Sequence, residues 1–195
     1  FTEYRVRIRP GIRYQPHPAL ARDDTGRLVY ESLDDRLARR ARALADFPES
    51  GTREATAEDY VYQIKRLAYA PLHSPIAGLM GGHIVGFDEF GKRTAEALTA
   101  LRERTGAAHP WLDLREHPMA GVRVLDRYAY AIRLKGYYPQ FRYWLAMTFF
   151  APMPWEADRF QHLPGLRERN ITLDWYPVGT GPFMLTENNP NLRVV

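Results

Sequence analysis

Near its C-terminus the chain reads YPVGTGPFML from Tyr176 to Leu185, so two glycines and two prolines stand directly ahead of a short apolar run. Gly179 and Gly181 can take positive φ or admit another backbone closely, whereas Pro182 fixes φ and donates no hydrogen bond. The stretch therefore predicts a rigid turn that delivers a strand over Phe183–Thr186. A phosphate-binding loop does not fit, because a dinucleotide fingerprint needs a third glycine and a helix N-terminus that meets the phosphate.

The first residues of the chain alternate between apolar and basic side chains with a strict period of two. The apolar positions are Tyr4, Val6 and Ile8, and the basic positions are Arg5, Arg7 and Arg9. This pattern predicts a strand over Tyr4–Arg9 with one buried face and one basic, solvated face. Pro10 and Gly11 are expected to end the strand in a turn.

Two amphipathic helices are predicted in the middle of the chain. Thr56, followed three residues later by Asp59, is a capping-box pattern, and apolar residues continue at helical spacing over Ala57–Tyr69. The same spacing recurs over Phe87–Thr105 and stops at a glycine. Glu58 and Asp59 are not expected to form a catalytic acid–base pair, because an exposed first turn offers nothing that would raise one pKa.

A second alternating region, Val122–Asp126 and Tyr128–Leu134, predicts two further strands of the sheet. Aromatic residues from Phe141 to Phe149 lie at helical spacing and indicate a helix that packs into the core. With the first strand and the two longer helices, these elements predict the α+β class, with an antiparallel sheet packed against helices.

Composition excludes several kinds of site. Hydrophobic residues make up 45% of the 195 positions and charged residues 26%, as in ordinary globular proteins. The absence of cysteine excludes disulfides, thiol catalysis and cysteine-based zinc sites. The six histidines form no HExxH pattern, so no metal site is expected. The sequence also lacks a recognisable arrangement of catalytic groups, and no cofactor or catalytic residue is expected. No run reaches the length of a membrane-spanning helix, and both ends suggest a piece of a longer chain.

Three short motifs occur in order over most of the chain. The first is Arg9-Pro10-Gly11-Ile12-Arg13-Tyr14, followed after a gap by Thr56-Ala57-Glu58-Asp59. The second is Ser74-Pro75 with the stretch His83–Glu89, and the third is the turn Gly179-Thr180-Gly181-Pro182 ahead of an apolar run. In this combination the motifs resemble the family 5 extracytoplasmic solute-binding proteins, which are the dipeptide and oligopeptide receptors of ABC importers.

The resemblance implies that residues 1–176 are the small α+β domain of a cluster-C periplasmic binding protein of the type II fold. Residues 177–195 would then return toward a first ligand-binding lobe that lies outside this sequence. Typical members pass quickly from the Tyr14 turn to the Thr56 helix, so the chain carries an insertion at about 15–55. We expect this insertion to be a surface arm, with a helix over Asp34–Ala45.

The implied function is non-enzymatic binding. Such a receptor delivers a peptide or another small solute to the permease of an ABC transporter, and it works in the periplasm without spanning the membrane or binding nucleic acid. By the same resemblance, Ser74, Ile76, Leu79 and Met80 are expected near the ligand cleft of the whole receptor.

Two other function classes stay open. A small hydrolase or transferase would use Glu58, Asp59 or His83, although the sequence lacks a nucleophile–base pattern. A tyrosine-rich nucleic-acid-binding domain would draw on 12 tyrosines and a net charge of +4. Binding to single strands that weakens with salt would identify such a domain.

Overall fold

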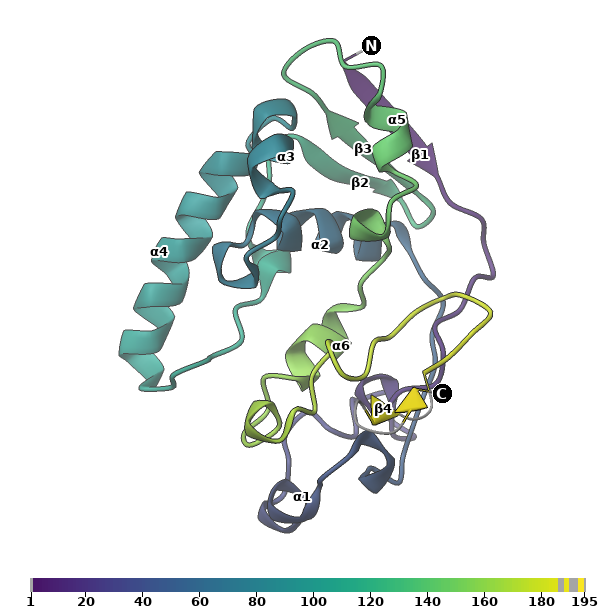
Figure 1. Cartoon of the computed structure of the whole chain (residues 1–195), viewed down its shortest axis with the longest axis vertical. Coiled ribbons are helices and arrows are strands. Elements are labelled where there is room, and N and C mark those ends of the chain that lie inside the picture. The colour runs from purple at the N-terminus through teal and green to yellow at the C-terminus, as the bar shows by residue number, and fades with distance from the viewer. Residues whose placement is uncertain (1, 186–187, 190–192, 195) are drawn as a thin grey trace. The chain divides into compact units, whose positions relative to one another are not determined.

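The computed structural model describes residues 2–185, 188–189 and 193–194 (Figure 1). Contacts group these residues into two compact units that are interleaved along the chain. The sheet unit comprises the residues up to Pro10 and Thr56–Met153, and the coil-rich unit comprises Gly11–Ala55 and the residues from Pro154 onward. The boundary at residue 176, expected from the family resemblance, refers to a larger protein and stays a prediction.

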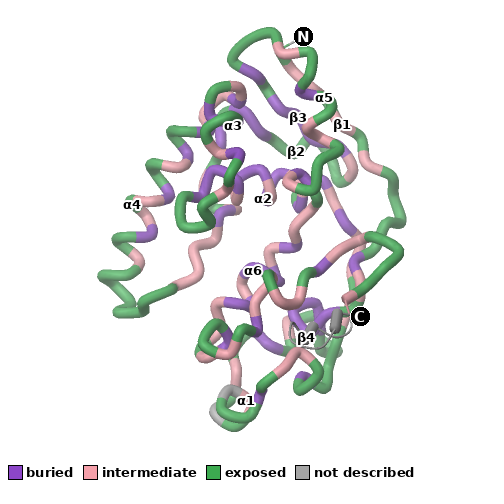
Figure 2. Tube along the Cα trace, in the orientation of Figure 1, coloured by how far each residue is buried: buried purple, intermediate pink, exposed green. Residues whose placement is uncertain are grey.

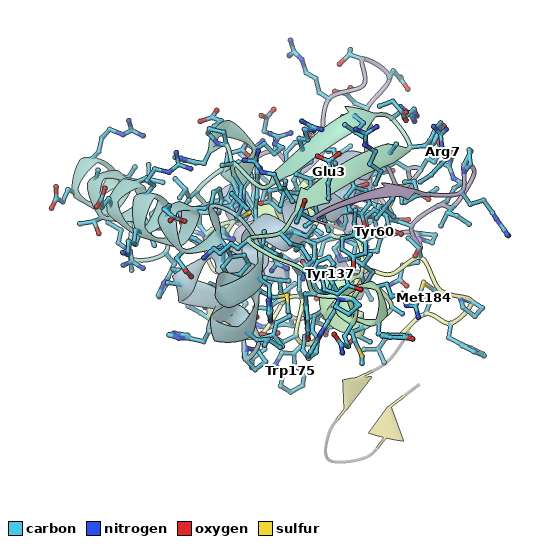
Figure 3. All side chains as sticks on the ribbon, turned by 90° about the horizontal axis from the view of Figure 1, so that it is seen from above. Glu3, Arg7, Tyr60, Tyr137, Trp175 and Met184 are labelled. Carbon is cyan, nitrogen blue, oxygen red and sulfur yellow. The ribbon has the colours of Figure 1, made fainter. Side chains whose placement is uncertain are left out.

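The sheet unit is built on three antiparallel strands, which confirms the α+β class. They are β1 (Glu3–Arg7), β2 (Val122–Asp126) and β3 (Ala129–Arg133), in the order β1-β3-β2 (Figure 1). Tyr130 on the central strand lies opposite Val6 and Val124. Four consecutive residues of β3 are buried, whereas β1 alternates, with Arg5 and Arg7 exposed. Figure 3 shows Glu3 and Arg7 near the two ends of β1.

Helix α2 (Ala57–Ala68) covers one side of the sheet through contacts with β2 and β3. Its apolar stripe, which includes Val61, Ile64 and Leu67, is buried along most of the helix (Figure 2). Helix α4 (Phe87–Thr105) has the bounds expected from the sequence, but its principal contacts are with α2 and α3 (Ala77–His83) rather than with the sheet. The expected packing of both long helices on the sheet is therefore correct for α2 alone.

The segment after α3 runs beside β3 and extends the pairing of the sheet. Ile84 forms an antiparallel bridge with Leu134, and the Val85 N–H donates to the carbonyl of Arg133. A Cβ atom at Gly121 would lie 2.2 Å from the carbonyl oxygen of Val85. Only glycine fits at this close approach, which fixes the start of the β2–β3 hairpin.

The aromatic segment after the hairpin forms two short pieces rather than the longer helix expected. They are α5 (Phe141–Trp144) and the 3₁₀ turn Thr148–Phe150. Phe141 and Phe150 are buried and meet edge to face, with ring centroids 6.1 Å apart. Tyr137, by contrast, is 74% exposed (Figure 3). Part of the aromatic content therefore lies outside the core.

The coil-rich unit has little regular structure. It contains α1 (Asp35–Arg40), α6 (Trp155–Phe160), and the two-residue strands β4 (Asn188–Asn189) and β5 (Arg193–Val194), which pair with each other. The remaining 3₁₀ turns among the described residues of both units are Pro18–Leu20, Leu44–Asp46, Ala70–Leu72, Leu114–Glu116 and Arg167–Arg169.

Residues of the expected insertion supply much of the core of the coil-rich unit. Tyr30, Phe47 and Phe160 are buried and lie in edge-to-face contact, with centroids 5.0 to 6.2 Å apart. Helix α1 is shorter than predicted, but Leu37 packs against the same core. The expectation of a surface arm at about 15–55 is therefore wrong, because these residues bury apolar side chains against the segment that follows Pro154.

The C-terminal turn differs from its prediction. Neither Gly179 nor Gly181 has positive φ, and residues 183–185 form no strand. Phe183 is 90% exposed, since no strand among the described residues pairs with this segment. Thr186, the last residue of the predicted strand, lies outside the described residues.

Candidate functional site

The four residues expected near a ligand cleft do not form one surface. Ile76 and Met80 are buried in the core of the sheet unit, with 8% and 0% exposure. Leu79 of α3 is 41% exposed, and Ser74 is half-buried. Because of this difference in burial, only Ser74 and Leu79 keep surface that a ligand could contact.

Ser74 lines an open hollow of about 600 Å³ between the end of α2 and α4, which we name the Ser74 hollow. Tyr69, Asp88 and Lys92 also line it. The Ser74 hydroxyl is buried and has no hydrogen-bond partner. His73 beside it has a φ of 48°, a left-handed conformation that is uncommon outside glycine.

The residues singled out as structural motifs lie at turns and at a helix start. Gly11 has a φ of 82°, which requires glycine, and its N–H donates to the Glu54 carboxylate. Gly179 accepts a backbone hydrogen bond from Gln15 at 2.9 Å. Thr180, Gly181 and Pro182 form a bend that follows this contact.

Thr56 and Asp59 open α2 as predicted, although the carboxylate provides most of the cap. The Thr56 N–H donates to Asp59 Oδ2 at 2.8 Å, whereas the Thr56 hydroxyl lies 3.4 Å from the same oxygen. Asp59 is only 1% exposed, which corrects the expectation of an exposed first turn. Its carboxylate is engaged in capping, while His83, another candidate catalytic group, stacks on Tyr138 at the end of α3.

We expect Asp59→Ala to destabilise the protein by about 2 kcal/mol, because the Thr56 N–H and the helix N-terminus lose an acceptor whose carboxylate is buried. Thr56→Ala keeps the backbone donor and should cost about 0.5–1 kcal/mol. Denaturant unfolding of both variants measures these losses as shifts in midpoint at constant slope. A larger loss for Thr56→Ala than for Asp59→Ala would show that the hydroxyl is the main cap.

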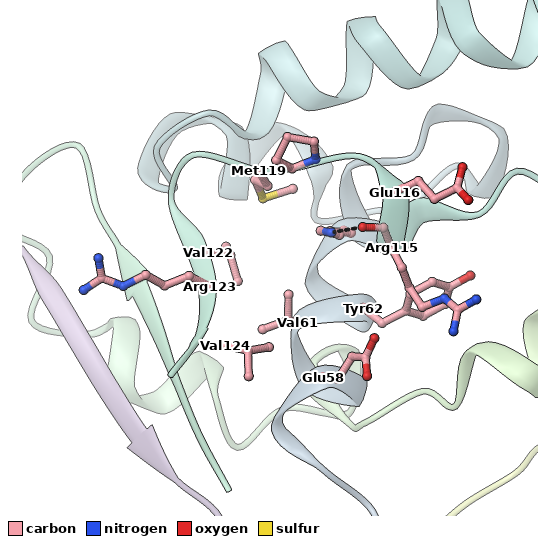
Figure 4. A pocket seen from close by; sticks show the side chains of 11 residues that line it. Glu58, Val61, Tyr62, Arg115, Glu116, Met119, Val122, Arg123 and Val124 are labelled. Carbon is pink, nitrogen blue, oxygen red and sulfur yellow. Dashed lines mark hydrogen bonds between the residues drawn. The ribbon is translucent and has the colours of Figure 1, made fainter. Parts of the chain in front are cut away.

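A second open hollow, of about 640 Å³, lies between α2, β2 and the segment before β2 (Figure 4). Its walls combine charged and aliphatic residues, with Val61 from α2 and Val122 and Val124 from β2 pointing toward one another (Figure 4). Met119 lines it from the segment before β2. We name it the Lys65 hollow, after the one lysine in its lining.

Lys65 is 7% exposed, which is unusual for a lysine. Its ammonium donates to the carbonyl oxygens of Leu114 at 3.0 Å and Arg115 at 3.5 Å, and it lies 6.0 Å from the ring centroid of Phe90. Burial lowers the pKa of Lys65, and the charges of Asp113 and Glu58 oppose this effect. Lys65 is therefore a buried cation held by main-chain oxygens.

Lys65 was not predicted from the sequence, although its distance along the chain from the apolar residues of α2 indicates a buried position. Position 65 is four residues after Val61 and three before Ala68, so it lies on the apolar stripe of α2. A charged residue on such a stripe is either turned outward along its aliphatic stem or paired inside. The structure shows the second arrangement, with peptide carbonyls as partners.

Two kinds of feature are absent from the described residues. No group of three or more histidine and acidic side chains there could hold a metal ion, and no helix in that part of the chain is long and apolar enough to cross a membrane.

The sequence matches no family model and no curated protein.

Proposed function

We propose that the chain is part of an extracytoplasmic receptor that delivers peptides or a similar small solute to an ABC importer. The proposal depends on the three motifs in family order. It predicts a non-enzymatic binding protein of the periplasm, whose partners are the solute and the transporter permease. The α+β class of the chain is the class that the resemblance implies.

One structural observation supports the proposal: the expected insertion begins and ends at neighbouring points of the backbone. Arg13 and Glu54 form an antiparallel bridge, and the Ala55 N–H donates to the carbonyl of Ile12 at 2.8 Å. Removal of the intervening residues would leave a short connection from the Gly11 turn to the helix at Thr56. Such a short connection is what the resemblance implies for typical members.

Gene deletion tests the proposal. Cells that lack the gene encoding this chain should lose most of their uptake of radiolabelled di- and tripeptides, while uptake of free amino acids stays unchanged. Expression of the intact gene should restore peptide uptake. Equal peptide uptake with and without the gene, in a strain without a second peptide importer, would contradict the proposed function.

The isolated chain should not bind peptides tightly. In the proposed receptor, most of the ligand site belongs to lobes outside this sequence, and each lost polar contact costs roughly 1–1.5 kcal/mol. Calorimetric titration with a mixed tripeptide library should therefore show no saturable binding tighter than about 10 μM. Tighter binding would show that a complete peptide site lies within these residues.

A further inference from the structure

We propose that the outer edge of β1 binds an extended segment of a partner protein in which acidic and apolar residues alternate. The segment would join the sheet as an additional strand beside β1. This inference concerns a protein partner and not a transported solute, so it does not depend on the proposed receptor function. It rests on the open edge of the sheet, the direction of the main-chain groups at this edge, and the charge beside them.

β1 is an open and regular edge of the three-stranded sheet (Figure 1). All five of its residues are in register with β3, and no other strand among the described residues pairs with it. β2, at the opposite edge, has a register shift between Val124 and Asp126. Such an irregularity hinders the addition of a strand, so β1 is the edge better suited to a further strand.

The main-chain groups of alternate residues of β1 point away from the sheet. The Ile8 N–H donates to the carbonyl of Tyr128 at 2.8 Å, and the Thr2 carbonyl accepts from the Leu134 N–H at 2.7 Å. In an antiparallel pair, successive residues turn their N–H and C=O groups to opposite sides of the strand. The even-numbered residues therefore face β3, and the odd-numbered residues present their main-chain groups to the open edge. These odd-numbered residues are Glu3, Arg5 and Arg7.

The side chains of these three residues lie on one face of the sheet, and the arginines there are only partly neutralised. Arg5 and Arg123 lie opposite the same residue of β3, and both pair with Glu3, at 2.8 and 3.2 Å. One carboxylate therefore serves two guanidiniums. Arg7 lies 3.9 Å from Asp126, which is beyond hydrogen-bond distance, and its side chain is 78% exposed.

Glu3 shows how this face holds a carboxylate. The hydrogen bond from Arg5 lowers the pKa of Glu3, and the charges of Arg123 and Arg133 lower it further. Arg133 lies opposite Glu3 on β3, so it belongs to the same face. Three guanidiniums thus act on one carboxylate. A further carboxylate from a bound strand would meet a net positive charge and the planar donor groups that carboxylates pair with best.

The opposite face of the sheet determines the other half of the partner's pattern. Tyr4 and Val6 are half-buried there, and the Tyr4 ring packs against Phe141 with the ring centroids 5.2 Å apart. Side chains of a strand alternate between the two faces of a sheet. A strand beside β1 would therefore place every second side chain next to Tyr4 and Val6, and the others next to the arginines. Apolar and acidic residues in alternation match these two faces.

A second copy of this chain does not match the edge. Two β1 strands paired with each other would bring Arg5 and Arg7 of both copies together across the junction, and like charges on neighbouring strands destabilise the pairing. Charged side chains on an edge strand are a common protection against such self-association. The edge is therefore selective for an acidic partner strand.

Titration of ¹⁵N-labelled protein with the peptide acetyl-TEVEVTV-amide tests the proposal. In an antiparallel arrangement its two glutamates lie opposite Arg7 and Arg5, and its second threonine lies opposite Glu3. Binding should be saturable, with a Kd on the order of 1 mM or tighter. The amide hydrogens of Glu3, Arg5 and Arg7 should exchange about tenfold more slowly with saturating peptide, because a strand at this edge gives them acceptors.

Two control peptides separate strand addition from attraction between charges. The same peptide with both glutamate amides N-methylated keeps its charge but loses the main-chain donors that face β1, so it should not bind. Acetyl-TKVKVTV-amide keeps the donors but reverses the charge, and it should not bind either. The proposal is overturned if either control peptide binds as tightly as the acidic peptide. Protection of the same amides by a short oligothymidylate but not by the acidic peptide would overturn it in favour of a nucleic-acid partner.

A pair of matched variants tests the arginine face. Arg7→Gln should weaken binding of the acidic peptide about threefold, because an exposed ion pair is lost. Arg104→Gln removes an exposed arginine from α4 and changes the net charge equally, so it should leave binding unchanged. Equal affinities of the two variants for the acidic peptide would contradict a role for the arginine face.

Discussion

Glu156→Gln is expected to lower the free energy of unfolding by about 3 kcal/mol, because it removes the charge at the centre of a buried ion cluster. The Glu156 side chain is 1% exposed, and Arg53 donates to both of its oxygens, at 2.8 and 2.7 Å. Arg22 donates to Oε1 at 3.1 Å. Glutamine has the same shape, but its amide nitrogen would face guanidinium donors and leave them without an acceptor.

Denaturant unfolding monitored by tryptophan fluorescence and circular dichroism measures this loss. Glu31→Gln is the matched control, since Glu31 also pairs with an arginine, Arg159, at 3.2 Å, but its side chain is 59% exposed. That exposed pair should contribute less than about 0.5 kcal/mol. Equal effects of the two substitutions would mean that burial does not strengthen the Glu156 cluster.

The sequence predicts the sheet unit well because its elements are periodic. The alternation over Tyr4–Arg9, the capping pattern at Thr56 and the glycine at position 106 each determine an element from local chemistry alone. The observed strands and helices begin and end within about two residues of these predictions. Which helix lies on the sheet was not predictable, because two amphipathic stripes of similar composition compete for the same face.

The coil-rich unit was not predictable in the same way. Its core residues, such as Tyr30 and Phe47, come from irregular segments in which no period of 2 or 3.6 appears. The ion cluster at Glu156 joins residues more than a hundred positions apart, and its carboxylate looks like an ordinary first-turn acid in sequence. Only the tertiary structure shows that these residues meet.

The residues of the candidate site were likewise predictable only in part from the sequence. Ser74 was chosen from a motif, and the structure places this residue beside a hollow with its hydroxyl buried. Ile76 and Met80 came from the same motif, but the 3.6-residue repeat of α3 turns them into the core. Lys65 belongs to no motif, so its burial against main-chain carbonyls is visible only in the structure.

Acidification from pH 6.5 to pH 4 is expected to destabilise the protein through His17, which is 2% exposed. Its ring packs edge to face on Phe160 at 5.6 Å, and Nδ1 accepts the Ala19 N–H at 3.0 Å, so the folded state holds a neutral imidazole. Burial lowers the pKa of His17 to about 4, whereas the unfolded value is 6.5. The unfolded state therefore binds the proton first as the pH falls, and stability is lost between these two values. The full loss is about 3 kcal/mol.

His17→Asn isolates this effect. The asparagine side-chain oxygen can still accept the Ala19 N–H as a helix cap, but it does not titrate in this range. Urea unfolding at half-unit pH steps should show the wild type losing about 3 kcal/mol more than His17→Asn between pH 7 and pH 4. The variant starts from lower stability, because its amide is buried in an apolar site, but this cost is the same at every pH. His109→Asn, at an exposed position, should reproduce the wild-type pH dependence. Parallel profiles for the wild type and His17→Asn would mean that the imidazole gains a proton in the folded protein as easily as in the unfolded chain.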